Sequence, residues 1–473
     1  MKINTNVTAM RANLNLNTVQ DRLTSSTQKL SSGYRITKAA DDAAGMAISR
    51  KMRAQIRGLA RASKNGSDGI SFIQTTEGAL SEVESMLQRC RELSVQAASD
   101  TYGIDDKKTI QDEIDELRGE IDRLSQQTEY NTMSVLDGSC CRQSSSTNVG
   151  VKLISASDDV SLTTYKLTVD TQATQTTATS GTLTFAPGDV VTDKEAGIIQ
   201  INGESITVKE GETYEEVFSQ IRDYCEMMNI DVAPVDGTGA ECDLANATSL
   251  NFTSVLYGAS YDIEITTDNP ELATKFGVDG LTKVVGKDAT VTLDTASGFS
   301  NTATVFVDGG RVEITDRNGF SMILDVSEAE ANSEAEVTML DAGYISIQIG
   351  ANEGQTIDIS IPSISCDALD ISNVNVCTSK GAAKAISAFD DAIQNISAIR
   401  SKLGAYQNRL DSSVSSLDTT TQNLTEACSR IEDVDMSEEM TQYTQYSVLV
   451  QAGTSMLAQA NNQPQTILQL LQG

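Results

Sequence analysis

Apolar residues recur at a seven-residue interval near both ends of the 473-residue chain. One such row runs from Met52 to Leu87, a shorter segment spans 110–124, and seven consecutive matches join Phe389 to Ile431. A sustained seven-residue period puts the apolar side chains on one seam of a helix and implies left-handed supercoiling against a partner. These segments therefore predict long, paired helices. The seam residues are Ile73, Leu80, Leu87, Ile110, Ile114, Leu117, Ile121, Leu124, Phe389, Ile396, Leu403, Leu410, Leu417, Leu424 and Ile431.

The first and last 40 residues form a different class of helical segment. Their apolar stripes are set among Asn, Gln, Ser and Thr, with few aromatic residues. Such a helix has little of its own to bury its stripe against, so alone in water it is expected to be largely disordered and to fold on meeting other copies or a partner. The stripe residues are Val7, Met10, Leu14, Leu23, Leu30, Leu449, Met456, Ile467 and Leu470.

The period changes to two between residues 166 and 340, which predicts β-strands. Asn202-Gly203 lies between GIIQI and ESITV and predicts a hairpin, and Asp308-Gly309-Gly310 predicts a second one. Residues 213–228 are expected to form a single helix within this region. The fold class is therefore α+β, with one or two antiparallel β domains inserted between the two halves of a helical rod.

Composition removes most enzyme classes. The chain has no histidine and no tryptophan, so it carries no HExxH zinc site, no Ser-His-Asp triad and no imidazole base. It has no CxxC pair, and the adjacent Cys140 and Cys141 are poorly spaced for a metal. Residues 141–380 contain no DxDxDG calcium loop. We therefore expect no catalytic residues, no bound metal and no cofactor.

Charge is distributed unevenly along the chain. The net charge of −31 should repel nucleic acid and anionic membranes, so neither is an expected partner. Residues 1–64 nevertheless carry 12 basic and 3 acidic side chains, whereas residues 141–380 carry 12 basic and 37 acidic ones. The early basic residues are interleaved with polar ones rather than clustered. No run of 18 apolar residues occurs, and the first 20 residues do not resemble a Sec signal peptide, so any secretion is expected to use another route.

Eight cysteines leave the disulfide state open. Cys90 and Cys428 occupy apolar positions of helical patterns, where a buried free thiol is the expected state. The sequence does not decide whether the other six are free or paired.

Several segments together resemble bacterial flagellin. The resemblance covers about residues 1–140 and 344–473, in order and at both ends. The matching segments are MKINTNVTAMRANLNLN, LSSGYRITKAADDAAGMAIS, LQRCRELSVQAASD, IQDEIDELRGEIDRLSQQTEYN, YISIQIGANEGQTIDI, IRSKLGAYQNRL, SRIEDVDMSEEM and QAGTSMLAQANNQPQTILQLL. A stretch near 197–225 is also similar to the IN-type repeat of flagellin variable regions.

The resemblance implies a folded-back chain that polymerises with copies of itself into the extracellular flagellar filament. Residues 1–43 and 434–473 would form inner filament-core helices. Residues 44–165 and 340–433 would form the helical rod with a small β element, and 166–339 the variable outer insert. The implied partners, besides other copies, are a flagellar export chaperone, the filament cap and the hook-junction proteins, after export of unfolded monomer through the flagellar type III channel.

The resemblance also implies recognition of the monomer by the host receptor Toll-like receptor 5. Gln88, Arg89, Leu93 and Glu113 match the family positions that the receptor recognises. Leu93 is expected to share an exposed apolar stripe with Met86 beside the Arg89 cation, although it could instead pack the rod or a neighbouring subunit. Cys90 departs from the usual aliphatic residue, a mild change if its thiol points inward.

Two other functions remain open from the sequence. A hook–filament junction protein has similar terminal helices, although SRIEDVDMSEEM and LAQANNQPQTILQLL are flagellin-like in detail. The insert could also act as an adhesin for mucus or glycan, since it has several Tyr and Phe but no clustered aromatic motif.

Overall fold

The computed structural model describes residues 5–157, 160–186, 188–278, 281, 283–317, 319–340 and 342–472. The chain divides into two compact units. Unit 1 consists of Met1–Gly69, Gln348–Ile357 and Arg409–Gly473. Unit 2 consists of Ile70–Ile347 and Asp358–Asn408. Unit 1 therefore combines the two ends of the sequence, and α1 lies against α7 within it, which confirms the α+β, folded-back architecture.

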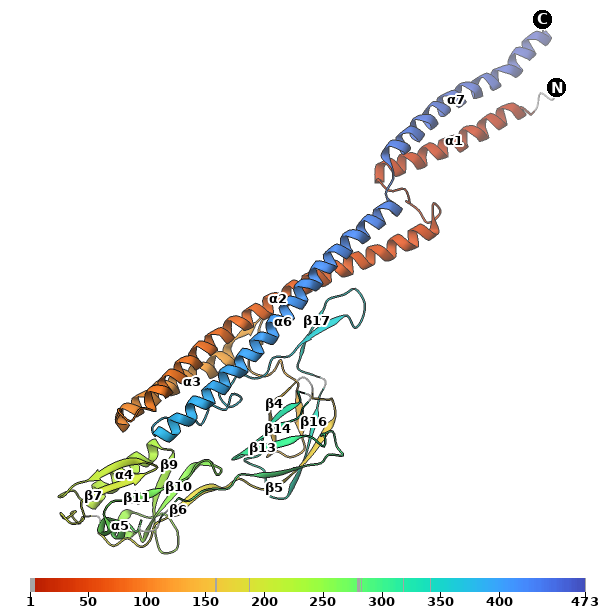
Figure 1. The fold of residues 1–473 in the computed structure, drawn as a ribbon. Helices are drawn as coiled ribbons and strands as arrows, with labels where there is room; N and C mark the ends of the chain where they lie inside the picture. The colour runs from red at the N-terminus through yellow and green to blue at the C-terminus, as the bar shows by residue number, and fades with distance from the viewer. Residues whose placement is uncertain are drawn as a thin grey trace. The chain divides into compact units, whose positions relative to one another are not determined.

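Helices form both ends of the chain, as the apolar periods predict (Figure 1). The α2 helix begins before the first residue of the seven-residue row, and α6 covers all seven of its matches. No helix in the described ranges is both long and apolar enough to cross a membrane. The α-helices are α1 (Val7–Ser32), α2 (Ala43–Ala97), α3 (Ile104–Gln127), α4 (Tyr214–Met227), α5 (Pro270–Phe276), α6 (Ser379–Glu432) and α7 (Met436–Gln472).

Helices α2 and α6 pair along their apolar seams. In unit 1 the backbone position of Gly66 permits close approach, because a Cβ there would lie 2.6 Å from Cγ2 of Val414. In unit 2 the Arg91 guanidinium contacts the Asp390 carboxylate at 2.5 Å. The Arg400 guanidinium also pairs with Glu84. These contacts fix which faces of the two helices meet.

The strands β1 to β18 lie between α3 and α6 in the sequence. Their bounds are β1 (Glu129–Tyr130), β2 (Met133–Ser134), β3 (Ser144–Ser146), β4 (Lys152–Ala156), β5 (Thr164–Thr171), β6 (Gln175–Thr179), β7 (Gly197–Ile201), β8 (Glu204–Val208), β9 (Ile230–Val235), β10 (Ser249–Tyr257), β11 (Ile265–Thr267), β12 (Thr290–Leu293), β13 (Thr304–Asp308), β14 (Arg311–Thr315), β15 (Ser321–Asp325), β16 (Ser333–Met339), β17 (Ile345–Gln348) and β18 (Thr356–Ile359). Every pairing among the strands β1–β16 is antiparallel, as the period of two predicts.

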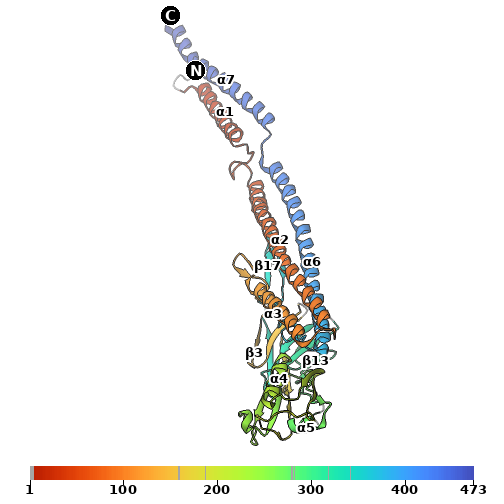
Figure 2. The ribbon, with the colours of Figure 1, turned by 90° about the vertical axis from the view of Figure 1, so that its left-hand side faces the viewer.

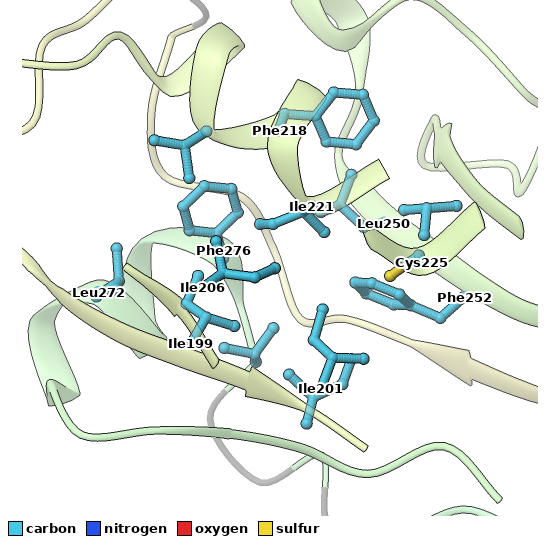
Figure 3. Close-up of a cluster of buried hydrophobic side chains, with 14 of the residues drawn as sticks. Ile199, Ile201, Ile206, Phe218, Ile221, Cys225, Leu250, Phe252, Leu272 and Phe276 are labelled. Carbon is cyan, nitrogen blue, oxygen red and sulfur yellow. The ribbon is translucent and has the colours of Figure 1, made fainter. Parts of the chain in front are cut away.

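One β core is built by the hairpin β7–β8, the sheet β6-β10-β9 and helices α4 and α5. The hairpin turns at Asn202 and Gly203, whose φ angles of 51° and 94° are those of a type I′ turn. A capping box starts α4, where the Thr213 hydroxyl accepts from the backbone N–H of Glu216 and the Glu216 carboxylate accepts from that of Thr213. In Figure 3, Phe218 and Ile221 of α4 lie over Ile199 and Ile206 of the hairpin. Both the predicted hairpin and the predicted helix are confirmed.

A second β core lies between two four-stranded sheets, β12-β5-β16-β3 and β13-β14-β15-β4. The rings of Tyr165, Phe299 and Phe320 cluster within it, with centroids 4.9–6.2 Å apart. The predicted second hairpin joins β13 to β14, with Asp308 opposite Arg311. This second core also includes Val151, which lies before residue 166, where the insert was expected to begin. The first and second β cores share no residue, so the β region contains two separate cores.

Candidate interaction surfaces

The helix pair α1–α7 is the first candidate surface, and its two members run side by side in both views (Figure 1, Figure 2). The Asn6 side chain caps α1 by accepting from the N–H of Ala9 at 3.1 Å, and its amide donates to the Ala460 carbonyl of α7 at 3.0 Å. Leu16 packs where α7 has Gly453, since a Cβ at that glycine would lie 3.1 Å from the Leu16 Cδ1 atom. On the inner side of the pair, the Asn6 side chain and the small residue Gly453 thus allow α1 and α7 to lie close together.

The outer side of the pair leaves large apolar side chains in solvent. Of the residues expected to mediate polymerisation, Val7, Met10 and Leu14 are 55–64% exposed, and Leu449 and Met456 are 44% and 65% exposed. We call these five residues the terminal stripe. Apolar side chains exposed in a row of this kind typically mark an interaction surface.

The other expected polymerisation residues are placed differently. Leu23 and Leu30 are half-buried on α1. The side chains of Ile467 and Leu470 lie outside the described residues. Val448 is 58% exposed beside Leu449 and was not singled out from the sequence, because adjacent helical residues point about 100° apart and the stripe pattern did not indicate it.

The second candidate surface surrounds Arg89 on α2. Its guanidinium contacts the Glu113 carboxylate of α3, with Nη2 to Oε1 at 2.8 Å and Nε to Oε1 at 3.1 Å. It also lies 3.5 Å from the Glu92 carboxylate. The hydrogen bond to Glu113 raises the pKa of Arg89 above its ordinary value. The Arg89 and Glu113 side chains are 50% and 47% exposed, so their charges remain available to a partner.

Gln88 and Leu93 complete the set that the resemblance identified. Gln88 is exposed beside Glu84, with Nε2 to Oε1 at 3.5 Å. Leu93 is only 2% exposed. The expectation that Leu93 forms an exposed apolar stripe in the monomer is therefore wrong, because tertiary packing covers it. Val95, the next exposed apolar residue on α2, is 49% exposed.

Cys90 lies directly beneath this surface. Its side chain is fully buried, so the thiol points inward. The replacement of the usual aliphatic residue by Cys90 is therefore expected to be a mild change. Burial raises the pKa of the Cys90 thiol to about 12. All eight cysteines, each within the described ranges, are free thiols, which answers the question that the sequence left open.

The seam residues separate into two groups by burial. Leu117, Leu124, Leu417, Leu424 and Ile431 are half-buried. The remaining seam residues are buried: Ile73, Leu80, Leu87, Ile110, Ile114, Ile121, Phe389, Ile396, Leu403 and Leu410. The described residues contain no group of three or more Cys, Asp or Glu side chains positioned to hold a metal ion.

Comparison with known proteins identifies relatives along the whole chain. Residues 3–140 match the model for the bacterial flagellin N-terminal helical region, and residues 386–471 match the one for the C-terminal helical region. The chain is 36% identical to a flagellin of Clostridium tyrobutyricum, covering 98% of this chain and 100% of that protein. It is 32% identical to a flagellin of Escherichia coli (strain K12), covering 100% and 99%. A solved structure of FliC from Burkholderia pseudomallei is 19% identical, with a TM-score of 0.24 over 72% of this chain and 99% of that one.

Proposed function

The chain belongs to the bacterial flagellin family, and on that premise we propose how its surfaces serve the filament. As a flagellin it is a structural subunit of the extracellular flagellar filament used for motility, and it is not an enzyme. The alignment of nearly the whole chain with whole flagellins carries this conclusion. It also favours the filament subunit over the hook–filament junction protein.

We assign self-assembly to the terminal stripe. Burial of an exposed apolar side chain stabilises an interface by roughly 25 cal/mol per Å² of apolar surface. Five large side chains that stay 44–65% exposed on α1 and α7 therefore supply a driving force that an isolated copy does not use. In this proposal residues 1–43 and 434–473 form the inner filament core. Residues 44–165 and 340–433 form the surrounding helical domain, and residues 166–339 face outward.

Export partners follow from the same exposed surface. A monomer that carries an apolar stripe needs cover before it reaches the growing end, because such patches promote aggregation. We propose that a flagellar export chaperone provides this cover, that the chain travels unfolded through the flagellar type III channel, and that the filament cap and hook-junction proteins meet it on assembly. The ordering of each terminal residue costs roughly 1–2 kcal/mol, which opposes premature assembly.

We also propose that the monomer is recognised by Toll-like receptor 5 through Gln88, Arg89 and Glu113. The exposed guanidinium, fixed in place by the two hydrogen bonds that it donates to one carboxylate, supports this assignment. A pre-positioned arginine suits an interface hot spot because little side-chain entropy remains to be lost. In this proposal Leu93 acts indirectly, by holding the α2 backbone beneath the contact surface.

Arg89→Ala tests the receptor assignment. Loss of a central interface arginine typically costs 2 kcal/mol or more, or about thirty-fold in affinity. The ion pair with Glu113 is half exposed, so its loss should lower the stability of unit 2 by no more than about 1 kcal/mol. Affinity for the receptor ectodomain is measured by surface plasmon resonance, and thermal melting is measured on the same samples.

Arg123→Ala is the matched control for Arg89→Ala. Arg123 lies on α3 with 47% of its side chain exposed, close to the exposure of Arg89, and pairs with Glu120 of the same helix. It should leave receptor affinity unchanged. If Arg89→Ala binds the receptor as tightly as the unmodified chain, the receptor assignment is wrong. If affinity falls only where the melting temperature also collapses, Arg89 serves packing instead.

A further inference from the structure

Four cations on α2 form a stripe with no ionic partner within the described part of the chain. Arg50, Arg57, Arg61 and Lys64 follow one another at intervals of seven, four and three residues. These intervals bring all four side chains onto one face of a helix with 3.6 residues per turn. All four are exposed. We call this face the basic stripe.

Most of the basic stripe faces away from α6 of its own copy, and only the end at Arg50 and Arg57 approaches Glu432, the last residue of α6. Two residues of α2 contact α6 nearby: the Ser63 hydroxyl donates to the Asp418 carboxylate at 2.8 Å, and Gly66 lies against Val414. At 100° per residue, Ser63 and Gly66 lie at least about 100° around the helix axis from every member of the stripe. The pairing of α2 with α6 through Ser63 and Gly66 therefore leaves Arg61 and Lys64 in solvent.

The cavity at one end of the stripe is also rich in cations. It has a volume of about 480 Å³, and its lining includes the side chains of Arg50, Arg53, Arg57, Tyr34 and Glu432. Three guanidinium groups therefore share one carboxylate, and Glu432 already pairs with Arg53 at 2.7 Å. Positive charge remains in excess here, which favours an incoming carboxylate.

The complementary charge is found near the other end of the same chain. Residues 409–473 carry two basic and eight acidic side chains. On α6, Asp411, Asp418 and Glu426 recur at intervals of seven and eight residues, so they share one helix face, and all three are exposed. We call this face the acidic face. Asp418 already accepts a hydrogen bond from Ser63 of its own α2, whereas Asp411 and Glu426 form no ion pair within the described residues.

The two charged faces also match in length. From Arg50 to Lys64 is 14 residues, or about 21 Å along a helix, and from Asp411 to Glu426 is 15 residues, or about 22 Å. Nucleic acid and anionic lipid would fit the basic stripe alone. The chain as a whole carries a charge of −31, however, and would repel both at longer range.

We propose that the basic stripe of α2 docks against the acidic face of α6 in a neighbouring copy of this chain. This inference rests on the proposed function, since it requires copies to assemble with one another. The terminal stripe attracts other copies through burial of apolar surface, which is non-directional and does not fix how far one copy is shifted along another. The charged faces set the register and orientation of neighbouring copies, because like charges brought together by a slipped register repel.

Charge reversal on full-length monomers tests this docking. Arg57→Glu with Arg61→Glu changes the stripe, and Asp411→Lys with Glu426→Lys changes the acidic face. Each pair should slow growth from unmodified filament seeds by at least about ten-fold, because reversed charges repel instead of attract. The variant that carries all four changes restores the complementarity, and its growth from seeds made of the same variant should return to within about three-fold of the unmodified rate.

A control variant separates register from net charge. Lys38→Glu with Lys51→Glu alters the net charge by the same amount at two exposed positions outside the stripe, and should grow normally. Circular dichroism verifies that each variant keeps its helices. Normal growth of either reversed pair overturns the proposal, as does slow growth that the four-fold variant fails to restore. Unmodified monomer grows from seeds in the same assay whatever the variants do, so failure here leaves the filament function intact.

Discussion

Replacement of Glu204 by glutamine tests the attachment of the first β core to the helices. Lys107 of α3 is only 2% exposed, and its ammonium donates to the Glu204 carboxylate of β8 at 2.7 Å. It also donates to the Ser379 hydroxyl at 3.3 Å, which in turn donates to Asp100 at 2.6 Å. Three segments that are distant in sequence, around Lys107, Glu204 and Ser379, are thus joined through one buried cation.

The two partners of this pair should respond unequally to substitution. Glu204→Gln keeps the shape of the side chain but leaves a buried ammonium without its carboxylate, and breaking a buried pair in this way costs about 3–5 kcal/mol. Since glutamine retains a hydrogen-bond acceptor, we expect a cost of about 3 kcal/mol, the lower end of that range. Lys107→Met leaves a carboxylate that is 21% exposed and can hydrate, so about 1–2 kcal/mol is expected.

Local hydrogen exchange is the suitable measurement, because a chain with two units does not unfold in one step. Amide protection in α3 and in the β7–β8 hairpin is followed by mass spectrometry for both single variants and for the double variant. The double variant should be less destabilised than the sum of the singles by at least about 1 kcal/mol, as residues in direct contact usually are. Protection equal to the unmodified chain in Glu204→Gln would refute the buried pair.

Four further outcomes are expected. Deletion of residues 1–30 or 445–473 should abolish growth from seeds, observed by electron microscopy, while circular dichroism retains most helix signal, because the terminal stripe is lost but α2 and α6 remain; filaments from either truncation would contradict the assignment. Deletion of residues 170–335 with a short linker should preserve assembly in the same assay, and adding Lys107→Met should raise its melting temperature, because the deletion removes Glu204. At pH 8, iodoacetamide should label Cys242 first, because the other seven thiols are buried and the pKa of Cys225 and Cys366 is raised to about 12. Burial favours the neutral form of these two thiols, so their contribution to stability is complete below about pH 9 and is lost as pH rises toward 12, which thermal melting can follow.

The sequence alone determined the elements whose signals are local. The seven-residue period predicted α2 and α6, because a repeat of this length is written in each helix regardless of its partner. Asn202-Gly203 predicted its hairpin, because a type I′ turn requires positive φ at both positions. The start of α4 was predicted to within one residue.

Only the tertiary structure decided which faces of those helices are covered. Leu93 lies on an apolar stripe that the sequence left exposed, and packing buries it. Leu417 continues the same row as Leu403 yet stays half-buried while Leu403 is buried. The burial of Lys107 likewise depends on Glu204, which lies 97 residues away. Periodicity reports the direction in which a side chain points, whereas burial depends on what distant segments place in front of it.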